Sequence, residues 1–334
     1  MTTNGSRPRH HHAGRRLAIA ACVIGLAVVS AFEAFGRVPG PRGVAVGGQL
    51  SVHPEKSAPS LQNEVPDGPL PPDGPQPLTL SVPAGPHLTV PILYYHYIRV
   101  IVPTPQNVLS FDLSISPALF AEQMALLHVE GAHPITLAML MSALAGKRRL
   151  PAHPVILTFD DGYADFATGV QPVMARYGFV ATDFVVSGFL NRPRYMTAAQ
   201  VRQMDADGMV IGSHTVHHLD LATIPVASAR TEIDDGKAAL EKLLRHPVLD
   251  FAYPYGGFNA AVGALVQQAG FRDAVTTLFG DVQSLNGQFV FRRIEIGGAP
   301  SLMTFAHDAG LPAPTASQSV QIADAVPGPP SRLA

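Results

Sequence analysis

Val155-Ile156-Leu157-Thr158-Phe159-Asp160-Asp161-Gly162-Tyr163 is a stretch in which a run of apolar residues leads directly into two acids and a glycine. The first five residues are mostly large, apolar or β-branched, which predicts a buried strand. Two neighbouring carboxylates at the end of a strand repel each other, and a bound cation would remove that repulsion. The alternative is a plain Asp-Asp-Gly turn, which turn chemistry also favours. The choice between a site and a turn depends on what the other predicted strands carry.

The composition limits the classes of protein to which this chain can belong. With 334 residues, of which 47% are hydrophobic, the chain can bury at least one sizeable core. Its formal net charge of -2 gives no electrostatic reason to expect a nucleic-acid partner. Cys22 is the only cysteine, so neither an intrachain disulfide nor a thiolate metal cluster is expected. Tryptophan is absent, so tyrosines would have to provide any stacking surface for a sugar.

Residues 1–37 are typical of a targeting segment. A basic region without acids is followed by an apolar run from Leu17 to Phe32. This run suits a signal peptide and is slightly short for a membrane span. Cleavage after Ala31 would release the protein, whereas an uncleaved segment would anchor it in the membrane with its basic end in the cytoplasm. We therefore expect the rest of the chain to be secreted or anchored to the outer face of the cytoplasmic membrane.

Two further segments lack the residues needed for a core. Residues 38–86 are rich in proline and glycine, and Pro-Asp-Gly-Pro occurs twice, at 66–69 and 72–75. This composition favours extended conformers and predicts a disordered linker. Residues 311–334, rich in proline, alanine and serine, are also expected to be disordered. The folded domain is therefore expected at 87–310.

Predicted strands and helices alternate within that domain. Strands are expected at 90–95, 155–159, 181–186, 209–214, 250–253, 274–277 and 293–296. Helices are expected at 117–130, 170–177, 197–207, 226–245 and from Asn259 to just before Gly270. Such strand–helix units predict a parallel sheet, either open or closed into a barrel, whose ligand sites gather at the carboxyl ends of the strands.

Two more polar groups stand at predicted strand ends. One is His214-Thr215-Val216-His217-His218. His214 and His218 are four positions apart, so a single helical turn would direct both imidazoles at one point. Two histidines with one carboxylate form a common set for a catalytic divalent metal, although three clustered histidines also occur in plain polar loops. The other group is Phe251-Ala252-Tyr253-Pro254-Tyr255-Gly256-Gly257, which could present a backbone N–H to a ligand or be an ordinary turn.

Taken together, the three groups resemble the successive motifs of the polysaccharide deacetylases, carbohydrate esterase family four. The order and the spacing agree over nearly all of residues 90–300. The opening strand Pro91-Ile92-Leu93-Tyr94-Tyr95-His96 and the Phe-Ala-Tyr-Pro form of the third group further resemble the branch that deacetylates the poly-N-acetylglucosamine of biofilm matrices. This resemblance implies an α/β fold, an irregular (β/α) barrel with fewer than eight strands.

The resemblance also implies roles for individual residues. It makes Asp161, His214 and His218 the ligands of a divalent metal, with zinc the first expectation and cobalt, nickel or iron as alternatives. Asp160 would be the general base, and the backbone N–H of Tyr255 would hold the oxyanion. Substrate binding is expected of the set Tyr163, Tyr253, Pro254 and His96.

The chain departs from the family pattern at three places. Most members have an arginine at the place of Ala252; Arg293 either takes over its role in orienting the base or is a surface arginine. The usual fourth motif contains tryptophan, and this chain has none. The fifth motif offers a histidine acid, and the sequence around His307 resembles it only loosely, so the general acid stays unassigned.

The function implied by the resemblance is metal-dependent N-deacetylation of an extracellular polysaccharide that contains N-acetylglucosamine, of the poly-N-acetylglucosamine type. The expected partner is therefore an N-acetylated polysaccharide, and the membrane if the N-terminal segment is uncleaved. Peptidoglycan and chitin are alternative substrates. The alternative outside the enzymes is a carbohydrate-binding domain whose catalytic site has decayed.

Overall fold

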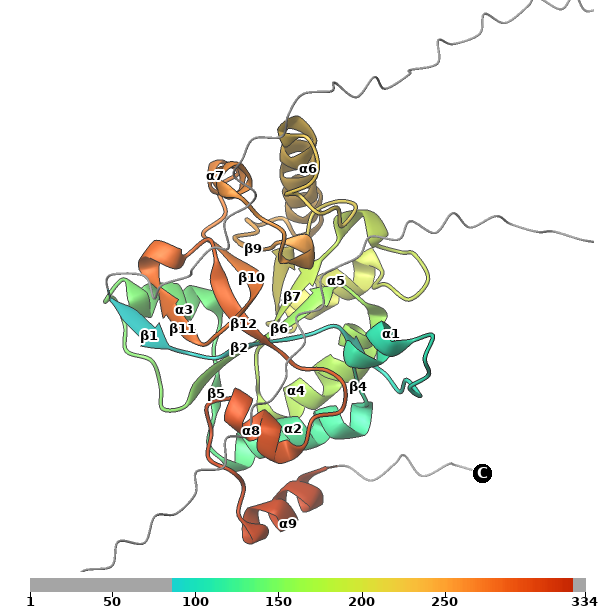
Figure 1. Ribbon diagram of the computed structural model, residues 1–334, viewed down its shortest axis with the longest axis vertical. Helices are drawn as coiled ribbons and strands as arrows, with labels where there is room; N and C mark the ends of the chain where they lie inside the picture. The colour runs from blue at the N-terminus through green and yellow to red at the C-terminus, as the bar shows by residue number, and fades with distance from the viewer. Residues whose placement is uncertain (1–85, 327–334) are drawn as a thin grey trace, which may run out of the picture. The chain divides into compact units, whose positions relative to one another are not determined.

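The computed structural model describes residues 86–326, and they contain a closed barrel of parallel strands. Seven strands form it in the spatial order β2, β6, β7, β8, β9, β10 and β12, and β12 pairs with β2 to close the ring. Their bounds are Ile92–Tyr95 (β2), Pro154–Asp161 (β6), Thr182–Val185 (β7), Val210–Ser213 (β8), Asp250–Ala252 (β9), Asp273–Phe279 (β10) and Phe291–Glu295 (β12). The prediction of an irregular (β/α) barrel with fewer than eight strands is confirmed (Figure 1).

The barrel is irregular in two places. A short strand, β5 (His133–Pro134), pairs with the start of β6 outside the ring. The register between β10 and β12 shifts between Val275 and Phe279. Elsewhere the register is regular, and Asp160 of β6 lies beside Phe184 of β7. Because all the strands of the ring are parallel, their carboxyl ends meet at one rim, where the polar groups of the sequence are found.

Two apolar clusters form the core. One fills the barrel with residues such as Ile92, Ile156 and Phe184, and it continues into the buried leucines of α3 (Leu137–Leu144). The other lies between the strands and the surrounding helices. Its members alternate along the strands with those of the first cluster, because successive side chains of a strand point to opposite faces.

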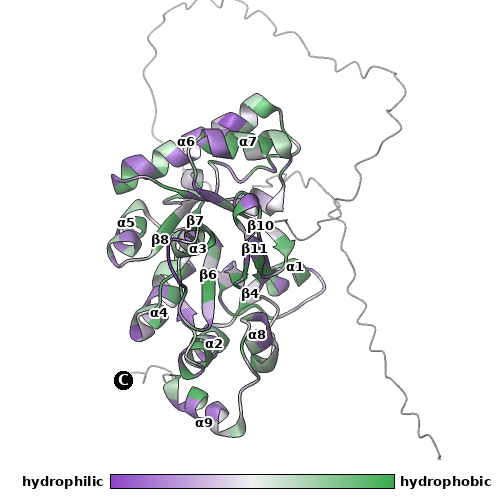
Figure 2. Cartoon of the chain, turned by 90° about the vertical axis from the view of Figure 1, so that its left-hand side faces the viewer, coloured by the Kyte–Doolittle hydropathy of each residue, from purple (hydrophilic) through white to green (hydrophobic). Residues whose placement is uncertain are grey.

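Helices pack around the barrel (Figures 1 and 2). Their bounds are Pro117–Val129 (α2), Gln171–Tyr177 (α4), Ala198–Ala206 (α5), Val226–Leu244 (α6), Ala260–Gln268 (α7) and Leu302–Asp308 (α8). A capping box starts α5, since Thr197 and Gln200 bond each other's backbone N–H groups, and Asn259 caps α7. Figure 2 shows apolar and polar sides on α6 and α7, as expected of helices that cover a core.

Several short elements complete the domain. Their bounds are His87–Thr89 (β1), Tyr97–Ile98 (β3), Val108–Asp112 (α1), Ser114–Ile115 (β4), Phe166–Val170 (π-helix η1), Ser187–Phe189 (3-10 helix η2), Pro254–Gly256 (3-10 helix η3), Val282–Ser284 (β11) and Leu285–Gly287 (3-10 helix η4). β1 pairs antiparallel with β11, and β3 pairs parallel with β4.

The prediction of a disordered tail from residue 311 is wrong for the residues that form α9 (Ala316–Ala325). A capping box of Thr315 and Gln318 starts this helix, and Ile322 is only 1% exposed within the core cluster. The tyrosine hydroxyl of Tyr177 donates to the carbonyl of Ala325 at 3.4 Å. A helix with one buried apolar anchor is hard to distinguish by composition from a tail rich in alanine and serine.

The predicted targeting segment and linker, and residues 327–334, lie outside the described residues. Within 86–326, no helix combines the length and the apolar character that a membrane crossing requires.

Candidate active site

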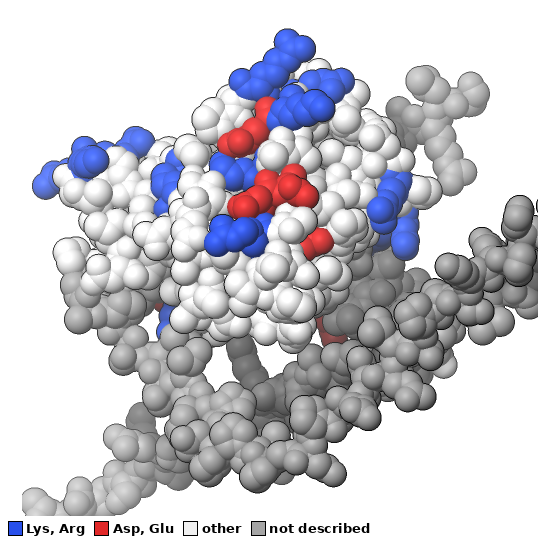
Figure 3. All heavy atoms as spheres, turned by 90° about the horizontal axis from the view of Figure 1, so that it is seen from above, with Lys and Arg blue, Asp and Glu red and all other residues white. Residues whose placement is uncertain are grey.

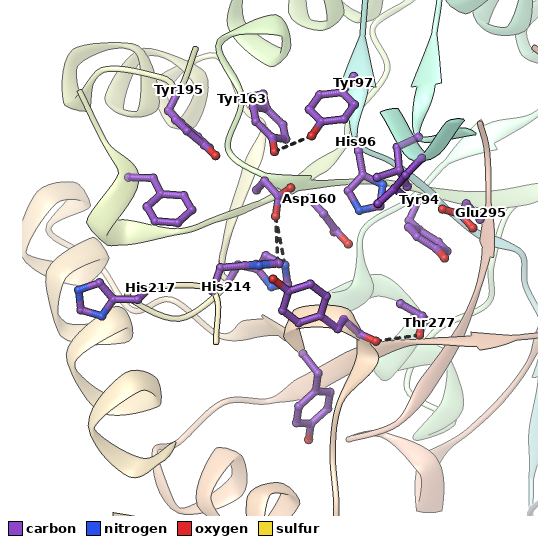
Figure 4. A pocket seen from close by; sticks show the side chains of 17 residues that line it. Tyr94, His96, Tyr97, Asp160, Tyr163, Tyr195, His214, His217, Thr277 and Glu295 are labelled. Atoms are coloured by element: carbon purple, nitrogen blue, oxygen red, sulfur yellow. Dashed lines mark hydrogen bonds and ion pairs between the residues drawn. The ribbon is translucent and has the colours of Figure 1, made fainter. Parts of the chain in front are cut away.

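A cavity of about 490 Å³ opens at the carboxyl ends of the strands (Figure 4). It contains both carboxylates of the Asp-Asp-Gly turn and the three histidines of the His214–His218 loop. The other residues that line it are Tyr94, His96, Tyr97, Leu109, Leu113, Tyr163, Phe189, Tyr195, Tyr253, Tyr255, Thr277 and Glu295. The residues of the first two predicted groups, far apart in sequence, therefore meet in one place.

Asp161, His214 and His218 converge on one point. Oδ1 of Asp161 lies 3.5 Å from Nε2 of His214 and 3.2 Å from Nε2 of His218. One ligand atom from each of the three residues lies within 4.8 Å of the others. The set of two imidazoles and one carboxylate is that of many catalytic divalent-metal sites.

The two imidazoles are held in the form that binds a metal. Nδ1 of His214 lies 2.8 Å from the carbonyl oxygen of Ala252, so Nδ1 donates and Nε2 keeps its lone pair. Burial and the neighbouring His218 lower the pKa of His214 to about 3. Burial also lowers the pKa of His218. Both rings are therefore neutral at neutral pH, as metal ligands must be.

The carboxylate of the set also fits a cation. Oδ1 of Asp161 is buried and has no hydrogen-bond partner among the described residues. Burial raises the pKa of Asp161 to about 6, with the charge of Asp160 acting in the same direction. A cation between this oxygen and the two imidazoles would stabilise the ionised carboxylate. The donors present therefore suit a divalent ion.

The histidines do not lie on a helical turn, contrary to the geometry that their spacing suggested. Residues 214–218 form a loop in which Thr215 and His218 have φ angles of 66° and 57°. Left-handed conformations cost about 1 kcal/mol or more for such residues and persist only where the surroundings impose them. The imidazoles converge because the loop folds back, with their ring centroids 4.7 Å apart.

Asp160 has an environment unlike that of Asp161. Both of its oxygens accept hydrogen bonds from Arg293, at 2.8 Å from Nη1 and 2.7 Å from Nη2. Burial alone would raise the pKa of Asp160, but the charge and hydrogen bonds of Arg293 outweigh it and hold that pKa well below its ordinary range. Arg293 is 1% exposed, so it is not a surface arginine. From β12 it therefore reaches Asp160, the predicted general base.

Three of the four predicted substrate-binding residues, Tyr163, His96 and Tyr253, line the cavity. Tyr163 lines the cavity, and its hydroxyl donates to that of Tyr97 at 3.1 Å. Its ring stacks on that of Tyr195 with centroids 4.9 Å apart. His96 also lines the cavity, on the side of Tyr94 and Tyr97 (Figure 4). Tyr97 and Tyr195 were not identified from the sequence, because each lies outside the three motifs.

Tyr253 and Pro254 are both buried, and Tyr253 is more deeply buried than Tyr163 and His96. Tyr253 is 1% exposed, and its ring packs against Phe251 and Phe258 in the outer core. Tyr253 follows the end of β9 directly and is still one of the residues that line the cavity. Pro254 is buried at the start of η3 and is not among the described residues that line the cavity. That Tyr253 and Pro254 bind substrate stays a prediction.

Tyr255, the proposed oxyanion donor, does lie at the cavity. Its φ of 57° is left-handed, the residue is 68% exposed, and its ring centroid lies 4.6 Å from that of His218. His307, the loose match to a family acid, is exposed on α8 and is not among the described lining residues. Glu295 is a further carboxyl group in the cavity that the sequence did not single out.

Comparison with known proteins agrees with this geometry. Residues 147–274 match the family model of the polysaccharide deacetylases. The chain is 26% identical over 216 residues to YxkH of Bacillus subtilis, a protein named for that family, and the match covers 65% of this chain and 74% of YxkH. The Streptococcus pyogenes deacetylase PplD in complex with acetate superposes with a TM-score of 0.62 and 29% identity, covering 66% of this chain and 98% of PplD.

Two relatives with named substrates match shorter segments. The chain is 31% identical over 119 residues to the peptidoglycan-N-acetylglucosamine deacetylase of Bacillus cereus, covering 35% of this chain and 54% of that protein. It is 29% identical over 119 residues to the poly-beta-1,6-N-acetyl-D-glucosamine N-deacetylase of Escherichia coli K12, covering 31% of this chain and 18% of that protein. The residues matched by the family model include both carboxylates and both histidines of the site, and the chain therefore carries a polysaccharide deacetylase domain.

Proposed function

We propose that this enzyme is a metal-dependent hydrolase that removes acetyl groups from an extracellular polysaccharide of the poly-N-acetylglucosamine type. The observation that carries the proposal is the meeting of Asp161, His214 and His218 at one point, with a second carboxylate, Asp160, in the same cavity. A decayed site would not be expected to keep a complete ligand set and a separate, oriented base.

The ligand set defines what a metal would add. A divalent ion held by Asp161, His214 and His218 would supply Lewis-acid activation of water and of the acetamide carbonyl. Zinc suits this set, and cobalt, nickel and iron are also compatible with it.

The chain itself supplies the proton transfers. Asp160, kept ionised and oriented by Arg293, accepts the proton of the attacking water. The backbone N–H of Tyr255 is the group we assign to the oxyanion. Leaving-group protonation requires an acid in the cavity, and we assign His96. His96 supports this assignment because it lines the cavity together with Asp160 and Asp161, directly after Tyr95, which pairs with Phe159 of β6.

The assignment to poly-N-acetylglucosamine has two supports. The opening strand that ends at His96 and the Phe251-Ala252-Tyr253-Pro254 segment resemble that branch of the family. The relative from Escherichia coli carries that substrate in its name. Aromatic side chains of the cavity, such as Tyr163 and Tyr195, would contact the sugar in place of the missing tryptophan.

The charge distribution is consistent with a neutral sugar polymer. The face seen in Figure 3 is largely uncharged, and acidic and basic side chains lie next to each other on it. Such a surface creates no strong field of one sign to attract a charged polymer. Peptidoglycan is the second candidate, favoured by the 31% identity to the Bacillus cereus enzyme.

We further propose that the enzyme works outside the cytoplasm. The basic start and the apolar run from Leu17 to Phe32 support a signal peptide or an anchor. The proline-rich residues 38–86 support a tether between that segment and the barrel.

The proposal is tested by acetate release from poly-N-acetylglucosamine, peptidoglycan and chitin by the purified, zinc-loaded protein. We expect turnover to be fastest on poly-N-acetylglucosamine. Faster release from peptidoglycan or chitin would reassign the substrate. Binding of a polymer without any acetate release would indicate a carbohydrate-binding protein instead.

A further inference from the structure

The loop from His214 to His218 depends on its surroundings for its shape. It carries two of the three proposed ligands, yet it contains two left-handed residues, Thr215 and His218. Within the loop, the N–H of His218 donates to Oγ1 of Thr215 at 3.0 Å. This short link cannot satisfy the other backbone groups of a loop that is neither helix nor strand.

Glu232 of α6 provides acceptors for this loop. Its Oε2 accepts the backbone N–H of Val216 at 3.1 Å and that of His217 at 2.8 Å. Its Oε1 lies 2.7 Å from Nδ1 of His217. Glu232 is only 7% exposed. Its buried carboxylate makes three contacts, all of them to the consecutive residues Val216 and His217. Charge-assisted hydrogen bonds of this kind are among the stronger ones in proteins.

The opposite side of the loop is held by the segment after β7. The N–H groups of Ser187 and Gly188 donate to the carbonyl oxygens of Thr215 and Val216, each at 3.0 Å. Val216 is therefore bonded through its N–H to Glu232 and through its carbonyl to Gly188. The loop lies in a slot between α6 and η2, and neither wall includes a proposed metal ligand.

Gly236, one helical turn after Glu232, brings α6 close to the loop. A Cβ atom at Gly236 would lie 2.9 Å from the backbone carbonyl carbon of Thr215, closer than real Cβ contacts allow. Residues four apart on a helix share one face. Glu232 and Gly236 therefore face the loop together, the first by bonding it and the second by leaving room for it.

His217 is tied to the same carboxylate and is not one of the three converging ligands. Its side chain is 58% exposed and points away from the other labelled side chains of the cavity (Figure 4). We propose that Glu232 is a positioning residue for the metal centre: through Val216 and His217 it fixes the loop so that His218 meets Asp161 and His214. This inference rests on the metal site of the proposed function.

The test measures zinc affinity of the full chain, by competition with a chromophoric chelator, so it needs no sugar substrate. We expect Glu232→Ala to weaken zinc binding by about 10–100-fold, the usual effect of losing a group that orients ligands. The zinc affinity of Glu232→Gln should lie between that of Glu232→Ala and that of the native protein. The amide oxygen of glutamine can still accept hydrogen bonds from the two N–H groups. Asp235→Asn, an exposed acid on the same helix, is the matched control and should bind zinc as the native protein does.

A second variant tests the loop position without changing charge. Gly236→Ala should push Thr215 and also weaken zinc binding, and in cobalt-substituted protein it should alter the visible absorption spectrum. Thermal unfolding of the metal-free proteins shows whether each variant is folded. Folded Glu232→Ala and Gly236→Ala proteins with native zinc affinity and a native cobalt spectrum would overturn the inference while leaving the metal site intact. A native protein that binds no zinc or cobalt would overturn the inference together with the proposed function.

Discussion

Two adjacent carboxylates, identical in chemistry, have been given different surroundings by the fold. Asp160 is bonded at both oxygens by Arg293, whereas Oδ1 of Asp161 has no protein hydrogen-bond partner among residues 86–326 and faces two imidazoles. We therefore expect Asp160→Asn to bind zinc normally and to lose about 10²–10⁴-fold in kcat, since only the general base is gone. Asp161→Asn should instead raise the zinc dissociation constant.

The measurements are zinc content after dialysis and acetate release at saturating zinc. Each variant is the control for the other, because both replace an oxygen by an amide nitrogen at neighbouring positions. Equal loss of zinc from the two variants would contradict the division of roles between base and ligand.

Arg293 is the second residue whose environment leads to a prediction. It is 1% exposed, and besides Asp160 it bonds the carbonyl of Thr276 and lies 4.3 Å from the ring of Tyr94. Arg293→Met would leave Asp160 buried without a partner, which costs about 3–5 kcal/mol. We expect a lower melting temperature and a lower kcat, because the base is no longer oriented.

Arg292→Met is the matched control, since Arg292 precedes Arg293 on β12 and is less buried. It should leave kcat nearly unchanged. If Arg293→Met retained native kcat, Arg293 would be a stabilising residue without a role in orienting the base.

His96 is the group to which we assign leaving-group protonation. His96→Gln should lower kcat by about 10²-fold or more without loss of zinc, because proton donation in the transition state is removed while the ligands stay. The variant for comparison is Glu295→Gln. Within residues 86–326, Glu295 is the one carboxyl residue that lines the cavity besides Asp160 and Asp161. A larger loss of kcat in Glu295→Gln than in His96→Gln would transfer the acid role to Glu295.

Residues that stand together in short motifs could be singled out from the sequence, whereas a contact between distant residues, such as that of Arg293 with Asp160, could be offered only as one of two alternatives. Asp160 with Asp161, and His214 with His218, stand within short motifs whose chemistry is visible in one dimension. The partner of Asp160 lies 133 positions away, and only the barrel closure brings it near. The sequence also did not show that Tyr253 would be almost fully buried.

At the scale of elements, strong local signals gave the right structures. Buried β-branched runs marked the strands of the barrel, and the Thr197–Gln200 capping box marked the start of α5. Two-residue strands such as β5 have too few side chains for an alternating pattern. α9 was missed because its stability depends on packing against the domain.

The packing of α9 leads to a prediction of its own. Ile322 is 1% exposed, while Val320 on the same helix is 61% exposed. Ile322→Ala should destabilise the protein by about 2–4 kcal/mol, because it removes a buried side chain and leaves a cavity. Val320→Ala should have little effect, and neither should change kcat, since neither residue lines the active-site cavity. Equal melting temperatures for the two variants would show that α9 does not contribute to the core.

At the scale of the molecule, alternating strands and helices could not distinguish an open sheet from a barrel. The distinction depends on the pairing of β12 with β2 and of β2 with β6, between segments far apart in the chain. Strand pairing over such distances leaves no local pattern in the sequence. The resemblance to a family supplied the barrel, and the closed ring confirms it.

The whole cavity, not the metal ligands alone, determines how long a substrate should be. Its lining extends from the ligand set to Tyr195 and Phe189 on one side and to Leu109 and Leu113 near α1. A polymer can contact these surfaces with sugars next to the reacting one, and such remote contacts help to position the acetamide. We therefore expect turnover of N-acetylglucosamine oligomers to rise from almost none on the monosaccharide through six units. Acetate release measured for each length is the test, with free acetamide as the control for unassisted chemistry. A flat profile, or fastest turnover of the monosaccharide, would point to a small amide as the substrate, and the metal site would remain compatible with that reaction.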